Sequence, residues 1–215
     1  MGRCTLGIDI GGSSIKFLLT EKTGKNDIIR DYFIEEIPGT IENREEYIFE
    51  KIRETIVLKK WQKYKCTVVI SGKEMNIRGI KLPKIPVDEL QPVIEREAKK
   101  IFGDIEDKKI VFEIMGEITV DERSYYSIFF ILFNQEIINR IVSAGIKIER
   151  VDFGIFAADR VYRDILSQEK NFAIIEFGGQ NTDIMIYQGK SLEIFREINI
   201  GSDELTETIS DMLQV

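Results

Sequence analysis

The residues best suited to chemistry lie near the start of the chain, in the segment Leu6–Phe17. There an apolar run ends in a carboxylate and is followed by a glycine turn and a second apolar run. Glycine adopts positive φ angles and lets backbone N–H groups approach an anion, and a lysine supplies a point charge for phosphate. The candidate phosphate-binding residues of this turn are Asp9, Gly11, Gly12, Ser13, Ser14 and Lys16. A plain glycine hairpin would show the same local pattern.

This pattern occurs a second time, at a constant separation of 167 residues. Ile8–Lys16 aligns with Ile175–Asp183, so that the carboxylates Asp9 and Glu176, both glycine pairs and both turns match. The second turn adds the candidate phosphate-binding residues Gly178, Gly179, Gln180, Asn181 and Thr182. Two such hairpins facing each other would hold a polyphosphate from both sides, and Asp9 and Glu176 would bind Mg²⁺ through its water ligands. The repeat therefore predicts a phosphate clamp. It is neither a Walker A loop nor a Rossmann fingerprint, because each turn leads into a strand.

Composition narrows the function classes. The 215 residues are 43% hydrophobic and 31% charged, as in an ordinary globular protein. A net charge of -7 argues against nucleic-acid binding. The chain has no histidine, which excludes Ser-His-Asp hydrolysis, Cys-His chemistry and His-based zinc sites. Its two cysteines lie far apart and are expected to be reduced.

The longest apolar run, Ile128–Phe133, is far shorter than the roughly 20 residues of a membrane span. We therefore expect a cytoplasmic protein.

Apolar periodicity predicts alternating strands and helices, which is typical of an α/β fold. Strands are expected at 4–10, 15–20, 28–36, 66–71, 76–83, 109–118, 125–133, 147–153, 171–177, 182–187 and 191–200. Helices are expected at 44–64, 93–102, 135–144 and 154–167. Another helix begins at 201–205, with Ser202 or Asp203 as its cap, and reaches Val215 without a stop signal, as if the chain were cut short. The apolar run Ile128–Phe133 is interpreted as a buried central strand and not as an edge that binds a partner.

The paired hairpins resemble the phosphate-1 and phosphate-2 motifs of the actin, heat-shock chaperone and sugar kinase superfamily. In detail the chain resembles the PilM family, FtsA-related actin-like proteins of type IV pilus assembly. The stretches that carry this resemblance are 6–16, 77–86, Glu89–Leu90, 95–98, 144–147, Val151–Asp152, 156–157 and 195–201. They extend over nearly the whole chain.

The resemblance implies an actin-like (ribonuclease H-like) fold with an inserted small α/β subdomain and an incomplete second domain. Residues 1–75 would form the first part of subdomain 1A, and residues 76–150 the inserted subdomain 1C. Residues 151–170 would form the crossing helix of 1A, and residues 171–215 the start of domain 2.

The resemblance also implies a role in a type IV pilus assembly platform. In this family the N-terminal cytoplasmic tail of the inner-membrane protein PilN docks in a groove beside subdomain 1C. The chain would then be cytoplasmic and membrane-associated only through partners. ATP and Mg²⁺ would be optional ligands, because the ATP site is incomplete in this chain. The chain could also form a homo-oligomer or ring.

Two departures from the family pattern bear on that role. Glu176 stands where the family usually has Asp, which moves the metal or its water by one methylene group. The family also continues into a glycine-rich adenosine-binding loop that this chain lacks, so we assign no catalytic residue and expect ATP hydrolysis to be slow or absent. A partly built second domain leaves a sheet edge exposed, which dimerisation would cover.

Other interpretations remain open from the sequence. One is a GspL-like cytoplasmic domain of a type II secretion system, which has a reduced actin-like fold. Another is a ROK-type sugar kinase, although its Asn-Asp-Ala segment and His/Cys metal site are missing. Asp159 lies in the predicted crossing helix, where the superfamily places a water-orienting residue. We interpret it instead as a solvated helix charge beside Arg160 and Arg163.

Overall fold

The computed structural model describes residues 3–39, 41–71, 75–103, 108–143, 145–166 and 168–214. Within these ranges the chain forms three β-sheets and five α-helices that alternate along the sequence. The α/β arrangement predicted from periodicity is confirmed.

The first sheet has five strands in the order β3–β2–β1–β4–β8. Its strands are β1 (Arg3–Ile10), β2 (Ser14–Thr23), β3 (Asn26–Glu36), β4 (Lys65–Ile70) and β8 (Lys147–Phe153). The first three are antiparallel neighbours, whereas β4 runs parallel to β1 and β8 runs parallel to β4. The subdomain border predicted at residue 150 therefore falls inside β8, because β8 hydrogen-bonds to β4 and completes this sheet.

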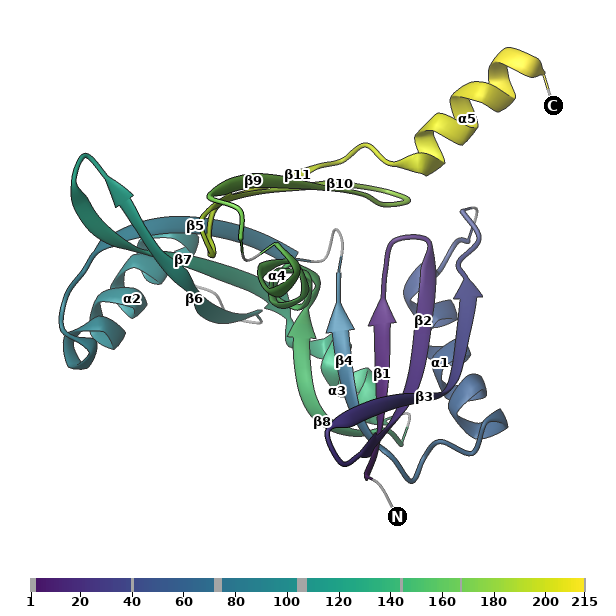
Figure 1. Cartoon of the computed structure of the whole chain (residues 1–215). Helices are drawn as coiled ribbons and strands as arrows, with labels where there is room; N and C mark the ends of the chain where they lie inside the picture. The colour runs from purple at the N-terminus through teal and green to yellow at the C-terminus, as the bar shows by residue number, and fades with distance from the viewer. Residues whose placement is uncertain are drawn as a thin grey trace.

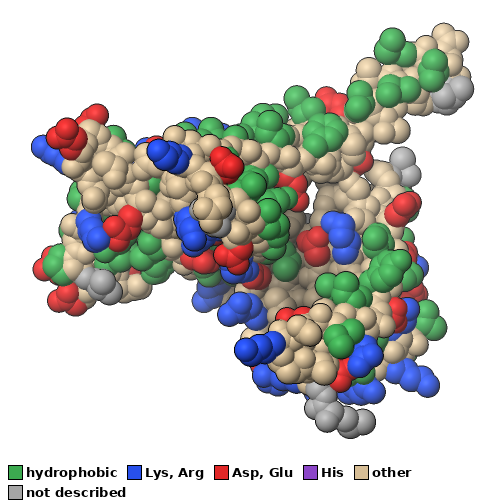
Figure 2. Space-filling view, viewed as in Figure 1, with side chains coloured by type: hydrophobic (Ala, Val, Ile, Leu, Met, Phe, Trp, Pro, Cys, Tyr) green, Lys and Arg blue, Asp and Glu red, His purple; other side chains and the backbone are tan. Residues whose placement is uncertain are grey.

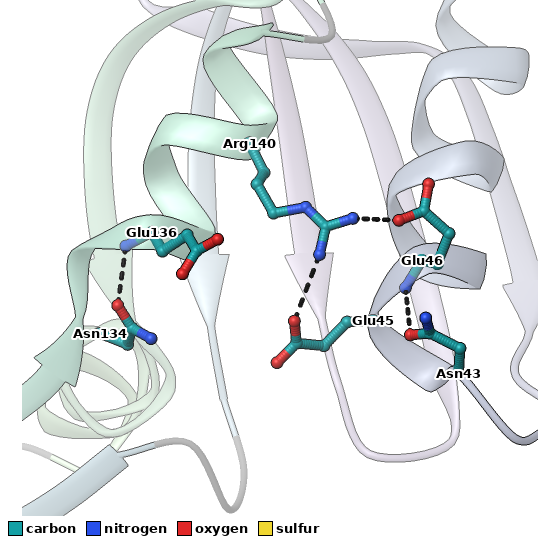
Figure 3. A network of polar contacts seen from close by, with 6 residues as sticks. All are labelled: Asn43, Glu45, Glu46, Asn134, Glu136 and Arg140. Carbon is teal, nitrogen blue, oxygen red and sulfur yellow. Dashed lines mark hydrogen bonds and ion pairs between the residues drawn. The ribbon is translucent and has the colours of Figure 1, made fainter.

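Helices cover both faces of this sheet. Helices α1 (Arg44–Leu58) and α3 (Gln135–Ser143) lie on one face, and α4 (Gly154–Ile165) lies on the other (Figure 1). Ile8, Phe17 and Ile52 are almost fully buried in the core between α1 and the sheet. Arg140 of α3 pairs with Glu45 and Glu46 in the first turn of α1, which joins the two helices (Figure 3).

Two asparagines cap these helices, and α1 is shorter than predicted. Asn43 accepts a hydrogen bond from the backbone N–H of Glu46, and Asn134 accepts one from that of Glu136 (Figure 3). Helix α1 ends at Leu58 and not near residue 64. The chain turns at Lys60, where φ is 56°, and this turn lets Trp61 enter the core.

The second sheet has the order β5–β7–β6 and is covered by α2 (Figure 1). Its elements are β5 (Met75–Pro83), α2 (Val87–Phe102), β6 (Lys108–Val120) and β7 (Arg123–Asn134). Strand β7 is central, and Ile128–Phe133 is buried on both sides as predicted. Ile128 and Phe130 pack in the cluster with α2, whereas Phe129 and Ile131 belong to the main core, which explains the continuous apolar run.

The third sheet has the order β11–β10–β9 and lies across the top of the view in Figure 1. It consists of β9 (Asn171–Phe177), β10 (Thr182–Gln188) and β11 (Ser191–Ile198). Met185, Tyr187 and Leu192 enter the main core from its inner side. The hydroxyl group of Ser127 on β7 donates a hydrogen bond to the carbonyl of Leu192, which ties this sheet to the second one.

Helix α5 (Ser202–Leu213) projects away from the rest of the molecule (Figure 1). The cap predicted at Ser202 or Asp203 is wrong. Gly201 is the N-cap and no side chain caps the helix; the N–H groups of Ser202 and Asp203 donate to the carbonyls of Gly178 and Gly179. The carbonyl groups of the second hairpin, and not a nearby side chain, thus accept hydrogen bonds from the first N–H groups of α5. Within the described ranges, no helix is both long and apolar enough to cross a membrane.

Candidate functional site

The two glycine turns lie at the same cleft, which has a volume of about 470 Å³. Of the residues predicted to bind phosphate or metal, ten line it: Asp9, Gly11, Gly12, Ser13, Ser14, Lys16, Glu176, Gly178, Gly179 and Asn181. Gln180 and Thr182 are not among the lining residues, and the hydroxyl group of Thr182 donates to the carbonyl of Ile200. The apolar wall comes from Val69 of β4 and from α4, including Ala157 and Val161.

Both turns are closed by the same backbone hydrogen bond. The N–H of Gly11 donates to the carbonyl of Ser14 at 3.0 Å, and the N–H of Gly178 donates to that of Asn181 at 2.9 Å. These two bonds are related by the 167-residue repeat, so the sequence repeat is also a structural one.

The carbonyl groups of both turns accept hydrogen bonds from other parts of the protein. Arg44, the first residue of α1, donates to the carbonyls of Gly11 and Gly12 at 2.9 and 2.8 Å. In the second turn the first amides of α5 do the same for Gly178 and Gly179. Engaged carbonyl oxygens repel an anion less, so both turns suit phosphate.

The tips of the two turns touch each other. A Cβ atom at Gly12 would lie 3.3 Å from the side chain of Gln180, and one at Gly179 would overlap Oγ of Ser13. That Ser13 oxygen is buried and has no hydrogen-bond partner among the described residues. The donor set therefore fits a phosphate group, but the turns must separate slightly to admit one between them.

The charges of the cleft are unevenly distributed. In the first hairpin, Nζ of Lys16 lies 3.1 Å from Oδ2 of Asp9. In the second, Asp183 is paired across the strands with Glu176 on β9 and Glu197 on β11. Burial, and then the charge of Glu197, raises the pKa of Asp183 to about 6. This half of the cleft suits a cation, although no three acidic or cysteine side chains in the described ranges are close enough together to bind a metal directly.

Sequence reasoning missed two residues of this site. Asp183 occupies the position of the second hairpin that aligns with Lys16, so the repeat itself could have identified it. Arg44 had no comparable signal, because its reach to the first turn depends on where α1 packs. The amide of Asn181, predicted to contact phosphate, here donates to Asp183 at 3.0 Å.

Asp159 is not the solvated helix charge that the sequence predicted. It is 0% exposed and is paired with Arg163 one turn later on α4. Burial is the main cause that raises its pKa, and Arg163 opposes that shift. Asp159 is not among the residues lining the cleft, and its side chain also contacts Tyr187 of β10. The interior packing of α4 decides this, and helical spacing alone could not show it.

Comparison with known proteins assigns the family. A family model described as "Type IV pilus assembly protein PilM" matches residues 7–215. The chain belongs to the PilM family. No curated protein matches this PilM-family chain.

Solved structures agree with this assignment at the level of the fold. A PilM–PilN type IV pilus biogenesis complex aligns with a TM-score of 0.78 at 18% identity; the match covers 98% of this chain and 66% of that one. A Bacteroides thetaiotaomicron protein with an actin-like ATPase fold and unknown function aligns with a TM-score of 0.62 at 9% identity, covering 99% and 78%. The cytoplasmic domain of EpsL, an inner-membrane component of the type II secretion system of Vibrio cholerae, aligns with a TM-score of 0.52 at 7% identity, covering 91% and 71%. The predicted actin-like fold is confirmed, and the chain spans just under two thirds of the matched chain in the PilM–PilN complex.

Proposed function

We propose that this chain is the cytoplasmic, actin-like component of a type IV pilus assembly platform, and that it binds the N-terminal tail of a PilN-like inner-membrane protein. The observation that carries this proposal is the PilM family match over residues 7–215. The TM-score of 0.78 to a chain in a PilM–PilN complex supports it. The chain would be associated with the inner membrane through this partner. A GspL-like role is the alternative, but the lower TM-score of 0.52 to EpsL favours the PilM role.

A groove between α2 and β6 is our candidate for the docking of the tail. It has a volume of about 450 Å³, and its floor is apolar where Ile94, Phe112 and Phe130 meet. Its rim is polar, with Gln91 and Glu95 hydrogen-bonded to each other at 2.8 Å. Strand β6 is the last strand in the order β5–β7–β6, so an extended peptide could lie beside it with alternate side chains in the groove.

Pull-down with two synthetic tails tests the proposal. The tail of the PilN-like protein encoded in the same genome should be retained, and the corresponding tail of a type II secretion protein should not. Glu95→Trp should weaken retention by filling the groove, whereas Arg96→Trp, the same change at the next exposed residue of α2, should leave it unchanged. Retention of neither tail, or only of the secretion tail, would refute the proposed role.

We also propose that the cleft binds the phosphates of ATP, with Mg²⁺ held through water by Asp9 and Glu176. Binding is expected to be weak and hydrolysis slow or absent, because phosphoryl transfer depends on positioning and Asp159 lies away from the cleft. Isothermal titration with Mg-ATP should show weak binding that Lys16→Ala abolishes and Lys22→Ala, a change elsewhere on β2, preserves. Submicromolar affinity, or turnover above background, would contradict this part.

A further inference from the structure

The end of the first sheet that lies away from the cleft is rich in exposed cations. We call it the basic end; it consists of Lys22, Lys25, Lys60, Lys63, Lys147 and Arg150, all of which are exposed. Figure 2 shows Lys and Arg side chains around this lower part of the molecule. A concentration of one charge on one end of a protein is an electrostatic feature that a charged partner can recognise.

The pairing register of the first sheet brings these residues together. Lys22 on β2 faces Arg3 on β1, and Lys65 on β4 faces both Thr5 on β1 and Lys147 on β8. The other members of the basic end lie on β8, in the turn between β2 and β3, and in the connection from α1 to β4. In Figure 1 this end of the sheet is at the bottom of the view, beside the N-terminus, whereas the first glycine turn is at the opposite end.

Ion pairs leave most of this positive charge uncompensated. Arg3 and Lys65 share one carboxylate, that of Glu149, at 2.5 and 2.6 Å, so these three side chains keep one net positive charge. Among the described residues, no carboxylate pairs with any member of the basic end. Because the whole chain has a net charge of -7, the acidic excess lies elsewhere in the molecule. The charge is therefore segregated, and an anionic surface would attract the chain with its basic end forward.

An exposed apolar side chain lies at the same end. Helix α1 starts beside the first glycine turn, where Arg44 binds the turn carbonyls, and ends at Leu58, which is 79% exposed. The aromatic residues that follow face the core, since Trp61 is buried and Tyr64 is half-buried. They cannot stack on nucleic-acid bases, as single-strand binding requires. Lysines around an exposed leucine suit instead an anionic surface with an apolar layer beneath it.

We propose that the basic end binds the anionic headgroups of a phospholipid membrane, with Leu58 entering the interfacial layer. This contact goes beyond the proposed function because it needs no protein partner. Each Lys or Arg near an anionic bilayer strengthens the attraction roughly fivefold, and salt screens it. The contact of the isolated chain is therefore weak and salt-dependent. A partner tail that holds the chain near the membrane would raise the local lipid concentration and strengthen it.

Co-sedimentation with vesicles tests this contact on the whole chain without any partner. The chain should bind vesicles of equal parts phosphatidylglycerol and phosphatidylcholine at low salt. It should bind neither these vesicles at high salt nor pure phosphatidylcholine vesicles. The double change Lys60→Gln and Lys63→Gln should weaken binding by roughly tenfold or more. Lys108→Gln with Lys109→Gln removes the same charge from exposed positions on β6 and should leave binding unchanged.

Absence of binding to the phosphatidylglycerol vesicles at low salt would refute the proposal. So would equal effects of the two double variants, or binding that salt does not weaken. An RNA oligonucleotide should not displace the chain from the vesicles; displacement would identify a nucleic-acid site and overturn the assignment to lipid.

Fluorescence quenching identifies the end that meets the membrane. In a Cys4→Ser chain, a fluorophore is attached either at Asn26→Cys, in the turn beside Lys25, or at Glu204→Cys on α5; both positions are exposed. Lipids with a nitroxide on the headgroup should quench the fluorophore at position 26 and not the one at position 204. Quenching at position 204 alone, or equal quenching at both positions, would contradict the proposed orientation.

Discussion

Replacement of Arg163 by Met should destabilise the protein more than replacement of its partner. The Asp159 side chain is 1% exposed and that of Arg163 is 30% exposed. Loss of Arg163 leaves a buried carboxylate without its ion-pair partner, which typically costs about 3–5 kcal/mol. We expect about 3 kcal/mol here, because the charge of Arg160 still favours the ionised form of Asp159. Asp159→Asn should cost less, because the freed guanidinium of Arg163 can turn towards water.

The pH dependence provides a second signature of this pair. Burial already raises the pKa of Asp159, and Arg163 lowers it. Removal of Arg163 should therefore raise the pKa of Asp159 further in the folded state. A carboxyl group whose pKa is raised by folding binds protons more tightly in the folded state. Its ionised form therefore lowers the free energy of unfolding, and this loss is greatest above the folded-state pKa. The deficit of Arg163→Met should therefore be largest at neutral pH and should shrink as the pH falls towards the unfolded pKa of about 3.9.

Urea unfolding of four proteins measures both effects. The wild type, Arg163→Met, Asp159→Asn and the double variant are compared at neutral and mildly acidic pH. The double variant should be more stable than Arg163→Met at neutral pH, because the uncompensated charge is gone. The reasoning fails if Asp159→Asn is the more destabilising single change, or if the deficit of Arg163→Met does not shrink in acid.

Three further predictions concern single sites. Gly201→Ala should lower the free energy of unfolding by about 1–3 kcal/mol, since its Cβ would overlap a backbone carbonyl, and Gly39→Ala, which has open space, serves as its control in urea unfolding. Because burial raises the pKa of Asp183 to about 6, the free energy of unfolding of the wild type should increase as the pH falls from 7 towards 5. Asp183→Asn should remove this gain. An equally steep dependence of the unfolding free energy on pH in the variant would count against the assigned pKa. Burial raises the pKa of Cys66 to about 12, so a thiol reagent should label only Cys4 in the native protein and both cysteines in urea; rapid native labelling of both would contradict the burial of Cys66.

The sequence identified the local features because their causes are local. Alternating apolar residues indicated the strands of all three sheets, and the 167-residue repeat indicated that the Gly11 and Gly178 turns have the same conformation. The unbroken run Ile128–Phe133 indicated a strand buried on both faces. Each of these follows from the conformational preferences of neighbouring residues.

Features that depend on distant segments could not be predicted in this way. Asp159 looks like a surface charge on its helix, but the sheets packed around α4 bury it. Gly201 replaces the expected side-chain cap of α5 because the carbonyls of the second turn, more than twenty residues earlier, accept the first helical amides.

The sequence alone determined the order of the elements, the two phosphate-type turns and the apolar surfaces that must be buried. These depend on residue type and spacing, which the chain carries with it when unfolded. Only the tertiary structure decided that the two turns meet tip to tip, and that Arg44 and the first amides of α5 donate hydrogen bonds to the carbonyls of these turns. Those outcomes depend on which surfaces pack together, and packing is set by the shape of the whole molecule.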